Sequence, residues 1–231
     1  MIVMQDKDKD YRFIPFRSEQ PLTPFTPQWQ YAIGEKFVDI DVDQLKDLVL
    51  EKEPEILSIK GDLNDGSTGL GVDSTTARYG YYNVLDWDHP EIKKLKAEIY
   101  QFHQQYLREV VGAEPFNVKV MCWCNIMRKG DRIHKHLHGL RSTTYLSGHF
   151  TISCNETKTI YVNPYEHKKE DELFDTNNEL VYQAENIPRK LTLFPSYIPH
   201  LTTEHKSDDE RITLAFDLTP FDVNTDFYIP L

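Results

Sequence analysis

The stretch that decides the fold of this chain is N-I-M-R-K-G-D-R-I-H-K-H-L-H, which runs from Asn125 to His138. Its three histidines, His134, His136 and His138, fall at every second position. An extended strand would present all three imidazoles on one face. Neutral imidazoles that converge in this way are ligands for a borderline divalent metal such as Fe(II) or Zn(II). The alternation therefore predicts two metal ligands from a single H-x-H segment.

A third ligand must come from another part of the chain, and the best donor is His200 in F-P-S-Y-I-P-H. Three protein ligands would leave coordination positions open for water or a substrate, as catalytic metal sites require. The alternative is a surface strand that is merely rich in histidine. The downstream motifs favour the metal site.

Arg211 and Thr213 open the last strongly apolar strand as R-x-T. Residues at i and i+2 of a strand share a face, and a guanidinium beside a hydroxyl is suited to binding a carboxylate. The competing interpretation is a surface ion pair between Arg211 and Asp208, Asp209 or Glu210. Because the R-x-T pair follows H-x-H and a lone histidine, we favour the carboxylate site.

The rest of the chain supplies the scaffold. Residues 1–35 are rich in proline and aromatic residues, which indicates extended, irregular structure over a core. Alternation predicts a strand over 36–43, and Asp43 is the expected cap of a helix that ends near Pro54. The glycine-rich segment 61–77 is predicted to be a loop. A second helix is predicted over 89–111, with Pro90 in its first turn and Gly112 after its end.

After Pro115 the pattern changes to short strands, predicted within 116–128, 141–154, 157–164, 189–195 and 211–218. Helices followed by a series of strands indicate a β-sandwich or barrel with the helices packed outside. The 231 residues are expected to form one domain. Residues 1–115 would provide an extension with supporting helices, and residues 116–220 the β-rich core.

Composition restricts the class of protein. The net charge of -11 argues against nucleic acid as a partner, because phosphate binding needs an excess of Lys and Arg. No apolar run has the length of a membrane span, and no signal peptide is evident at the start, so we expect a soluble, cytoplasmic protein. The three cysteines, Cys122, Cys124 and Cys154, are interpreted as core residues rather than a disulfide framework or metal ligands.

The motifs together resemble the Fe(II)/2-oxoglutarate-dependent oxygenases, and most closely the prolyl-hydroxylase-like group of bacteria and tailed phages. The resemblance covers about residues 120–218. The matching positions are Trp123, Asn125, Gly130, His136, His138, Ser147, Gly148, Phe194–Ser196, His200 and Glu210–Ile212.

The resemblance implies a jelly roll, also called a double-stranded β-helix. It implies Fe(II) bound by His136, His138 and His200, and 2-oxoglutarate bound by Arg211 and Thr213 with Asn125 nearby. The interval from Asn125 to His136 is similar to that in related nucleic-acid demethylases, where it leads to the first ligand, so His134 is expected outside the ligand set. Where most of the superfamily has a carboxylate, this chain has His138. The implied reaction uses dioxygen to hydroxylate a C–H bond of a prolyl or other amino-acyl residue in a peptide.

Two alternatives follow from the same residues. The first is a three-histidine dioxygenase of the cupin type, which explains His138 but gives Arg211 no role. The second is a non-catalytic jelly roll that holds a metal for structural reasons. The R-x-T pair disfavours the second alternative, because a structural metal site needs neither an open position nor a carboxylate clamp.

Overall fold

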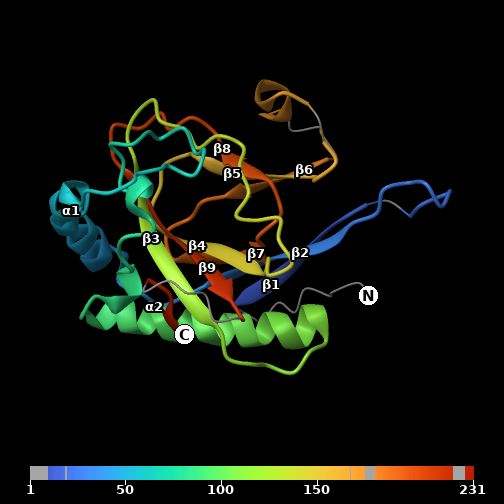
Figure 1. The fold of residues 1–231 in the computed structure, drawn as a ribbon, viewed down its shortest axis with the longest axis horizontal. Coiled ribbons are helices and arrows are strands. Elements are labelled where there is room, and N and C mark those ends of the chain that lie inside the picture. Colours follow the sequence, from blue (N-terminus) through green and yellow to red (C-terminus); the bar gives the residue numbers. More distant parts are fainter. Residues whose placement is uncertain (1–9, 19, 167, 175–179, 221–226) are drawn as a thin grey trace.

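The computed structural model describes residues 10–18, 20–166, 168–174, 180–220 and 227–231. In these ranges the chain folds into two antiparallel sheets that face each other, with two helices outside (Figure 1). The strands are β1 Tyr11–Arg17, β2 Gln30–Phe37, β3 Lys119–Met127, β4 Leu146–Ser153, β5 Lys158–Val162, β6 Val181–Glu185, β7 Lys190–Pro195, β8 His200–Thr202, β9 Arg211–Thr219 and β10 Ile229–Pro230. The helices are α1 Val42–Ser58 and α2 Pro90–Tyr106, the latter continued by a π-helical turn over Leu107–Val111.

The large sheet has the strand order β1-β2-β7-β4-β9-β3-β10, and the small sheet has the order β6-β5-β8. All the strand pairs in both sheets are antiparallel. The predicted jelly-roll class, mainly β with helices packed outside, is confirmed. The five strands expected after Pro115 correspond to β3, β4, β5, β7 and β9.

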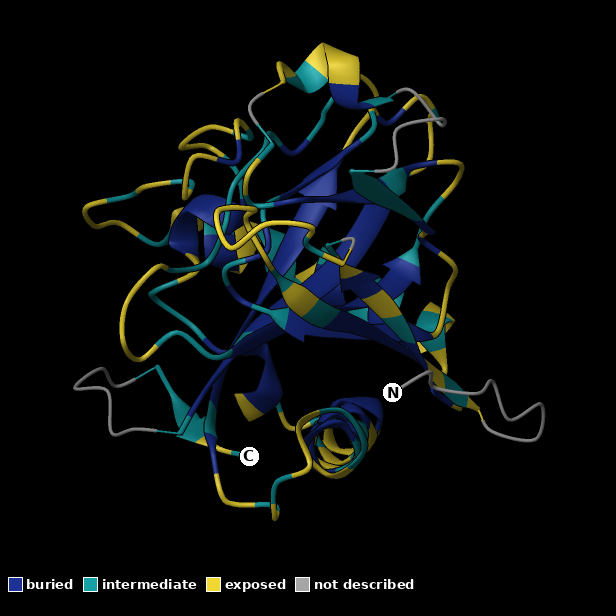
Figure 2. Ribbon diagram, turned by 90° about the vertical axis from the view of Figure 1, so that its right-hand side faces the viewer, coloured by how far each residue is buried: buried dark blue, intermediate teal, exposed yellow. Residues whose placement is uncertain are grey.

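The large sheet uses its two faces differently because successive side chains of a strand point to opposite sides. Outward residues of β3, β4 and β9 pack with α1 and α2 in the main apolar core, among them Cys122, Cys124 and Phe216. Cys122 and Cys124 are fully buried there as free thiols, which confirms their interpretation as core residues. Figure 2 shows α2 beneath the buried strands of the large sheet. The opposite face of this sheet is turned toward the small sheet and carries the polar residues described below.

Both predicted helices are present, with differences at their ends. His89 caps α2, Pro90 is its first residue, and Gly112 follows the π-helical turn in the left-handed conformation, as expected. The cap of α1 is Asp41 rather than Asp43, because the Asp41 carboxylate accepts from the amide of Gln44. Pro54 does not end α1, which continues to Ser58.

The N-terminal segment differs from the sequence-based expectation. Residues 11–17 and 30–37 are not irregular but form the hairpin β1–β2, and β2 pairs with β7 of the large sheet. The strand expected over 36–43 therefore ends already at Phe37. Pro15 fits this arrangement because β1 is the edge strand, where no ladder partner needs its missing N–H.

Candidate metal centre and cosubstrate cavity

Three histidines meet between the two sheets. One nitrogen from each of His136, His138 and His200 lies within 4.8 Å of the others. Their ring centroids are 4.4 Å apart for His136 and His200, 5.1 Å for His138 and His200, and 5.4 Å for His136 and His138. The structure thus brings together the three residues that the sequence proposed as ligands.

Backbone pairing fixes the positions of these rings. His136 and His200 form an antiparallel bridge, in which each amide donates to the other's carbonyl at 3.1 and 2.9 Å. The amide of His138 donates to the Ser196 carbonyl at 2.8 Å. The H-x-H segment is therefore not a regular strand, but it runs beside the Ser196–His200 segment as an edge of the small sheet. That pairing places alternate side chains on the same side and accounts for the convergence of His136 and His138.

Each of the three rings has its Nδ1 already hydrogen-bonded. His136 Nδ1 donates to the His134 carbonyl at 2.8 Å, and His200 Nδ1 donates to the Ile198 carbonyl at 3.0 Å. His138 Nδ1 lies 2.6 Å from a carboxylate oxygen of Asp217. A proton on Nδ1 leaves the lone pair on Nε2. All three histidines are thus held in the tautomer that can bind a metal through Nε2, as outer hydrogen bonds do in metal sites.

Burial favours the neutral form of two of these imidazoles, His136 and His200. Burial lowers the pKa of His136 to about 4, and the neighbouring His138 lowers it further. The pKa of His200 lies well below its ordinary value for the same reason, with His136 and His138 as secondary causes. Because only a neutral imidazole can accept a metal ion, His136 and His200 are in their metal-binding form at neutral pH.

His134 lies apart from this cluster. Its amide pairs with the Thr68 carbonyl in the 61–77 loop, and its Nδ1 is 3.0 Å from a Glu170 carboxylate oxygen. The ring packs over Gly69, where a Cβ would lie 1.8 Å from a His134 carbon atom. An extended strand would have placed His134 on the same side as His136, but the crossing of the 61–77 loop turns the side chain outward.

Strand β9 carries a polar row into the space between the sheets. Arg211, Thr213, Ala215 and Asp217 all belong to its inward face. The neighbouring strands continue the rows, because Asn125 and Thr151 both pair with Thr213. The Asn125 side-chain oxygen accepts from the Thr76 hydroxyl at 2.7 Å, which ties this row to the 61–77 loop. The R-x-T pair and Asn125 therefore line the same cavity as the histidines.

Arg211 is buried without a carboxylate partner in the described part of the chain. Its side chain is 2% exposed, and its Nη1 contacts Met127 Sδ at 3.1 Å. Burial lowers its pKa. The surface ion pair with Asp208 or Glu210 does not form, because these acids lie near Lys129 and Lys46 instead. A buried cation of this kind is costly unless an anion accompanies it.

Arg211 Nε is one of several buried polar atoms that lack a hydrogen-bond partner among the described residues. Others on the strands of the two sheets are His149 Nε2, Thr151 Oγ1, Tyr161 Oη and Thr192 Oγ1. Such unmatched groups are rare in protein interiors. His149 and Arg211 line the cavity directly. Burial lowers the pKa of His149 to about 3, so this imidazole is neutral. Sequence reasoning missed His149, although strand alternation places it on the inward face of β4.

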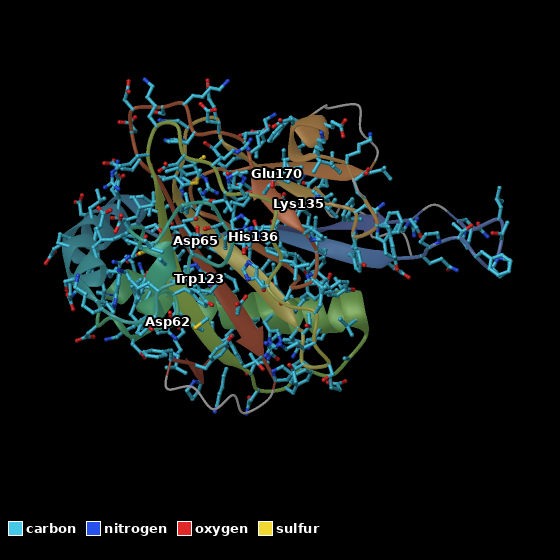
Figure 3. The ribbon with its side chains drawn as sticks, turned by 45° about the horizontal axis from the view of Figure 1, so that its top comes forward. Asp62, Asp65, Trp123, Lys135, His136 and Glu170 are labelled. Carbon is cyan, nitrogen blue, oxygen red and sulfur yellow. The ribbon has the colours of Figure 1, made fainter. Side chains whose placement is uncertain are left out.

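Two aromatic rings line the cavity beside the histidines. The Trp123 ring centroid lies 5.8 Å from that of His138 and 5.7 Å from that of Tyr79. Asp65 of the 61–77 loop also lines the cavity. Figure 3 labels Asp65, Trp123 and His136, three of the residues that line the cavity. The cavity thus combines the Arg211 guanidinium, the histidine cluster and aromatic rings.

Comparison with known families gives a match over the second half of the chain. A model of the family described as "Putative 2OG-Fe(II) oxygenase" matches residues 121–217. This range contains all three clustered histidines, Asn125 and the R-x-T pair. None of the curated proteins searched matches the chain.

Solved structures share the fold at low sequence identity. A prolyl-4-hydroxylase from Pseudomonas putida is 12% identical with a TM-score of 0.51, over 82% of this chain and 93% of that one. AviO1 from Streptomyces viridochromogenes Tue57 is 12% identical with a TM-score of 0.55, over 84% and 92%. The non-heme alpha-ketoglutarate-dependent carbocyclase SnoK from nogalamycin biosynthesis is 12% identical with a TM-score of 0.53, over 87% and 92%.

No helix in the described ranges has the length and apolar character that a membrane crossing requires.

Proposed function

We propose that the chain is an Fe(II)- and 2-oxoglutarate-dependent oxygenase that hydroxylates a prolyl or other amino-acyl residue of a peptide, with His136, His138 and His200 as the ligands of Fe(II). The ligand assignment is supported by the hydrogen bonding of all three Nδ1 atoms, which leaves the Nε2 lone pairs free, and by the clustering of one nitrogen from each ring within 4.8 Å. The donor set suits Fe(II), which accepts imidazole nitrogen. Three protein ligands leave room for cosubstrates.

The inner end of the cavity suits 2-oxoglutarate. We assign its distal carboxylate to Arg211 and Thr213, and Asn125 lies in the same row of side chains. Support comes from the unmatched donors at this end, because Arg211 Nε lacks a hydrogen-bond partner in the described ranges. A carboxylate would neutralise the buried guanidinium and accept its N–H groups. The hydroxyls of Thr151 and Tyr161 are further donors within the same region.

When bound, Fe(II), 2-oxoglutarate and dioxygen supply the oxidising chemistry, which converts a C–H bond to C–OH while 2-oxoglutarate becomes succinate and carbon dioxide. The protein's residues position these partners and exclude water. Phe194 packs its ring against His200 at 4.9 Å, and Trp123 lies beside His138, so apolar rings border the histidine cluster.

Two observations support a prolyl or other amino-acyl substrate: the aromatic rings that line the cavity and one structural neighbour. Aromatic-lined grooves bind proline-rich segments by packing against their preformed, ring-bearing surfaces. Trp123 and Tyr79 provide such rings in the cavity lining. The neighbour from Pseudomonas putida with the same fold is a prolyl-4-hydroxylase.

The test incubates the Fe(II)-loaded protein with 2-oxoglutarate, dioxygen and a panel of proline-containing peptides. Each peptide has a matched version with alanine in place of proline. We expect succinate release to rise with at least one proline peptide, which gains one oxygen atom by mass spectrometry, while its alanine version does not. His200→Ala, with retained circular dichroism, should lose the activity. Peptide oxidation without 2-oxoglutarate would instead support the three-histidine dioxygenase.

A further inference from the structure

We infer that Asp217 is the outer carboxylate of the metal centre, and that it supplies through His138 the negative charge that three neutral imidazoles lack. This inference rests on the proposed ligand set. It assigns a function to a residue that the R-x-T motif did not include, although Asp217 lies six positions after Arg211 on the same face of β9.

The three candidate ligands differ in what their Nδ1 atoms contact. His136 and His200 donate to backbone carbonyls, which are neutral. His138 donates to the Asp217 carboxylate at 2.6 Å, shorter than either of those contacts. A hydrogen bond to an ionised acceptor is stronger than one to a neutral carbonyl. His138 is therefore the ligand whose nitrogen becomes the most electron-rich donor.

A second hydrogen bond, from Ser147, holds the Asp217 carboxylate in place. The Ser147 hydroxyl donates to the same carboxylate oxygen at 2.5 Å and contacts Ser196 Oγ at 2.8 Å. Ser147 and Asp217 are direct register partners on β4 and β9, so the sheet itself fixes this contact. Ser196 also accepts the amide of His138 through its carbonyl. The network thus joins the ring and the backbone of His138 to one carboxylate.

The charge of Asp217 is directed at the histidine cluster. Within the described ranges, its only ion-pair partner is His138, and no Lys or Arg competes for it. The two side chains are 9% and 19% exposed, so solvent screens their interaction little. A divalent ion bound by three neutral imidazoles keeps its full double charge. A carboxylate one hydrogen bond away offsets part of that charge without occupying a coordination position, which preserves space for the cosubstrates.

The test compares metal binding by Asp217→Asn with that of the parent protein. Asparagine has nearly the same shape and can still accept the His138 N–H, so it removes the charge while keeping the contact. Calorimetric titration with Mn(II) and Co(II) measures affinity, and the Co(II) visible spectrum reports the ligand field. Loss of an outer partner typically costs about tenfold to a hundredfold in metal affinity, and we expect a loss in that range with shifted Co(II) bands.

Two control variants test whether the effect depends on the charge of Asp217, on the hydrogen bond that positions it, or on any negative charge in the cavity. Ser147→Ala removes a hydrogen bond to Asp217 but keeps its charge, so its loss of affinity should be well below that of Asp217→Asn. Asp65→Asn removes a charge that lines the same cavity without a hydrogen bond to any of the three histidines, and it should leave the Co(II) spectrum unchanged. Circular dichroism of each metal-free variant verifies the fold.

Affinity and Co(II) spectrum of Asp217→Asn equal to those of the parent would overturn the inference while leaving the ligand set intact. An equal effect of Asp65→Asn would also overturn it, since the charge would then act through space rather than through His138. Absence of Mn(II) and Co(II) binding by the parent would overturn the ligand set and this inference together.

Discussion

Replacing Arg211 with methionine should strengthen the fold and abolish cosubstrate binding at the same time. The guanidinium is 2% exposed, its Nε has no hydrogen-bond partner in the described ranges, and burial lowers its pKa. A buried polar group without partners costs about 1–3 kcal/mol, and more when it is charged. Methionine fills similar space without that cost. The free energy of unfolding of the metal-free variant should therefore rise by about 1–3 kcal/mol.

The same substitution removes the proposed partner of the 2-oxoglutarate carboxylate. Removing one member of a desolvated ion pair typically costs about 3–5 kcal/mol. Since 1.4 kcal/mol corresponds to about a factor of ten, the affinity for 2-oxoglutarate should fall at least about a hundredfold. Arg211→Lys keeps the charge and loses the planar fork, so its affinity should be intermediate, without the gain in stability.

Two measurements on the same preparations test this pair of effects. Urea unfolding of the metal-free proteins gives the change in stability, and calorimetric titration of 2-oxoglutarate into the Mn(II)-loaded proteins gives the change in affinity. A methionine variant that is less stable than the parent would show that Arg211 is a structural residue with good partners. A variant that binds 2-oxoglutarate as well as the parent would remove Arg211 from the cosubstrate site.

Further predictions concern four other positions. Thr213→Val should weaken 2-oxoglutarate binding by about 1 kcal/mol, the net value of one hydrogen bond. The affinity for Mn(II), measured by the same calorimetric method, should not change. A loss of 2-oxoglutarate affinity as large as that of Arg211→Met would contradict this division of roles. His136→Ala should abolish Mn(II) binding whereas His134→Ala should keep it, because His134 is hydrogen-bonded to Glu170 outside the cluster; the opposite order would move the ligand pair. Burial lowers the pKa of His103 to about 4, so between about pH 6.5 and 4 the unfolded chain binds a proton that the folded chain does not, and stability must fall as the pH drops. His103→Gln should reduce the loss of unfolding free energy between pH 7 and 5 by about 2 kcal/mol in urea titrations, and an unchanged pH dependence would show that His103 is not the responsible group.

The sequence was most informative where side-chain alternation and burial coincide. Strands β3, β4 and β9 are buried on both faces, yet their inward polar residues still mark the face that holds the site. His200 could be identified because it follows a strand and a proline-rich turn. Asp217 was accessible to the same reasoning that found Arg211 and Thr213, because it continues their alternation on β9.

Other features depend on tertiary contacts that local patterns do not contain. The proline- and aromatic-rich N-terminus forms β1 and β2 because Phe13 packs against Phe102 of α2 at 5.7 Å, a contact far along the chain. His134 leaves the histidine cluster because the 61–77 loop crosses beside it. Likewise, only the folded structure with both sheets in place shows that His149 Nε2 and Arg211 Nε lack hydrogen-bond partners among the described residues.

We propose that three histidines and Arg211 hold Fe(II) and 2-oxoglutarate in one cavity. The most direct test of this assignment adds 2-oxoglutarate to the Fe(II)-loaded protein without oxygen and records the visible absorption spectrum. Chelation of Fe(II) by the keto acid should produce a visible charge-transfer band in the parent. The band should be absent in His200→Ala, and in Arg211→Met it should require at least about a hundredfold more 2-oxoglutarate. A parent protein that binds Fe(II) but shows no band at any 2-oxoglutarate concentration would contradict the account.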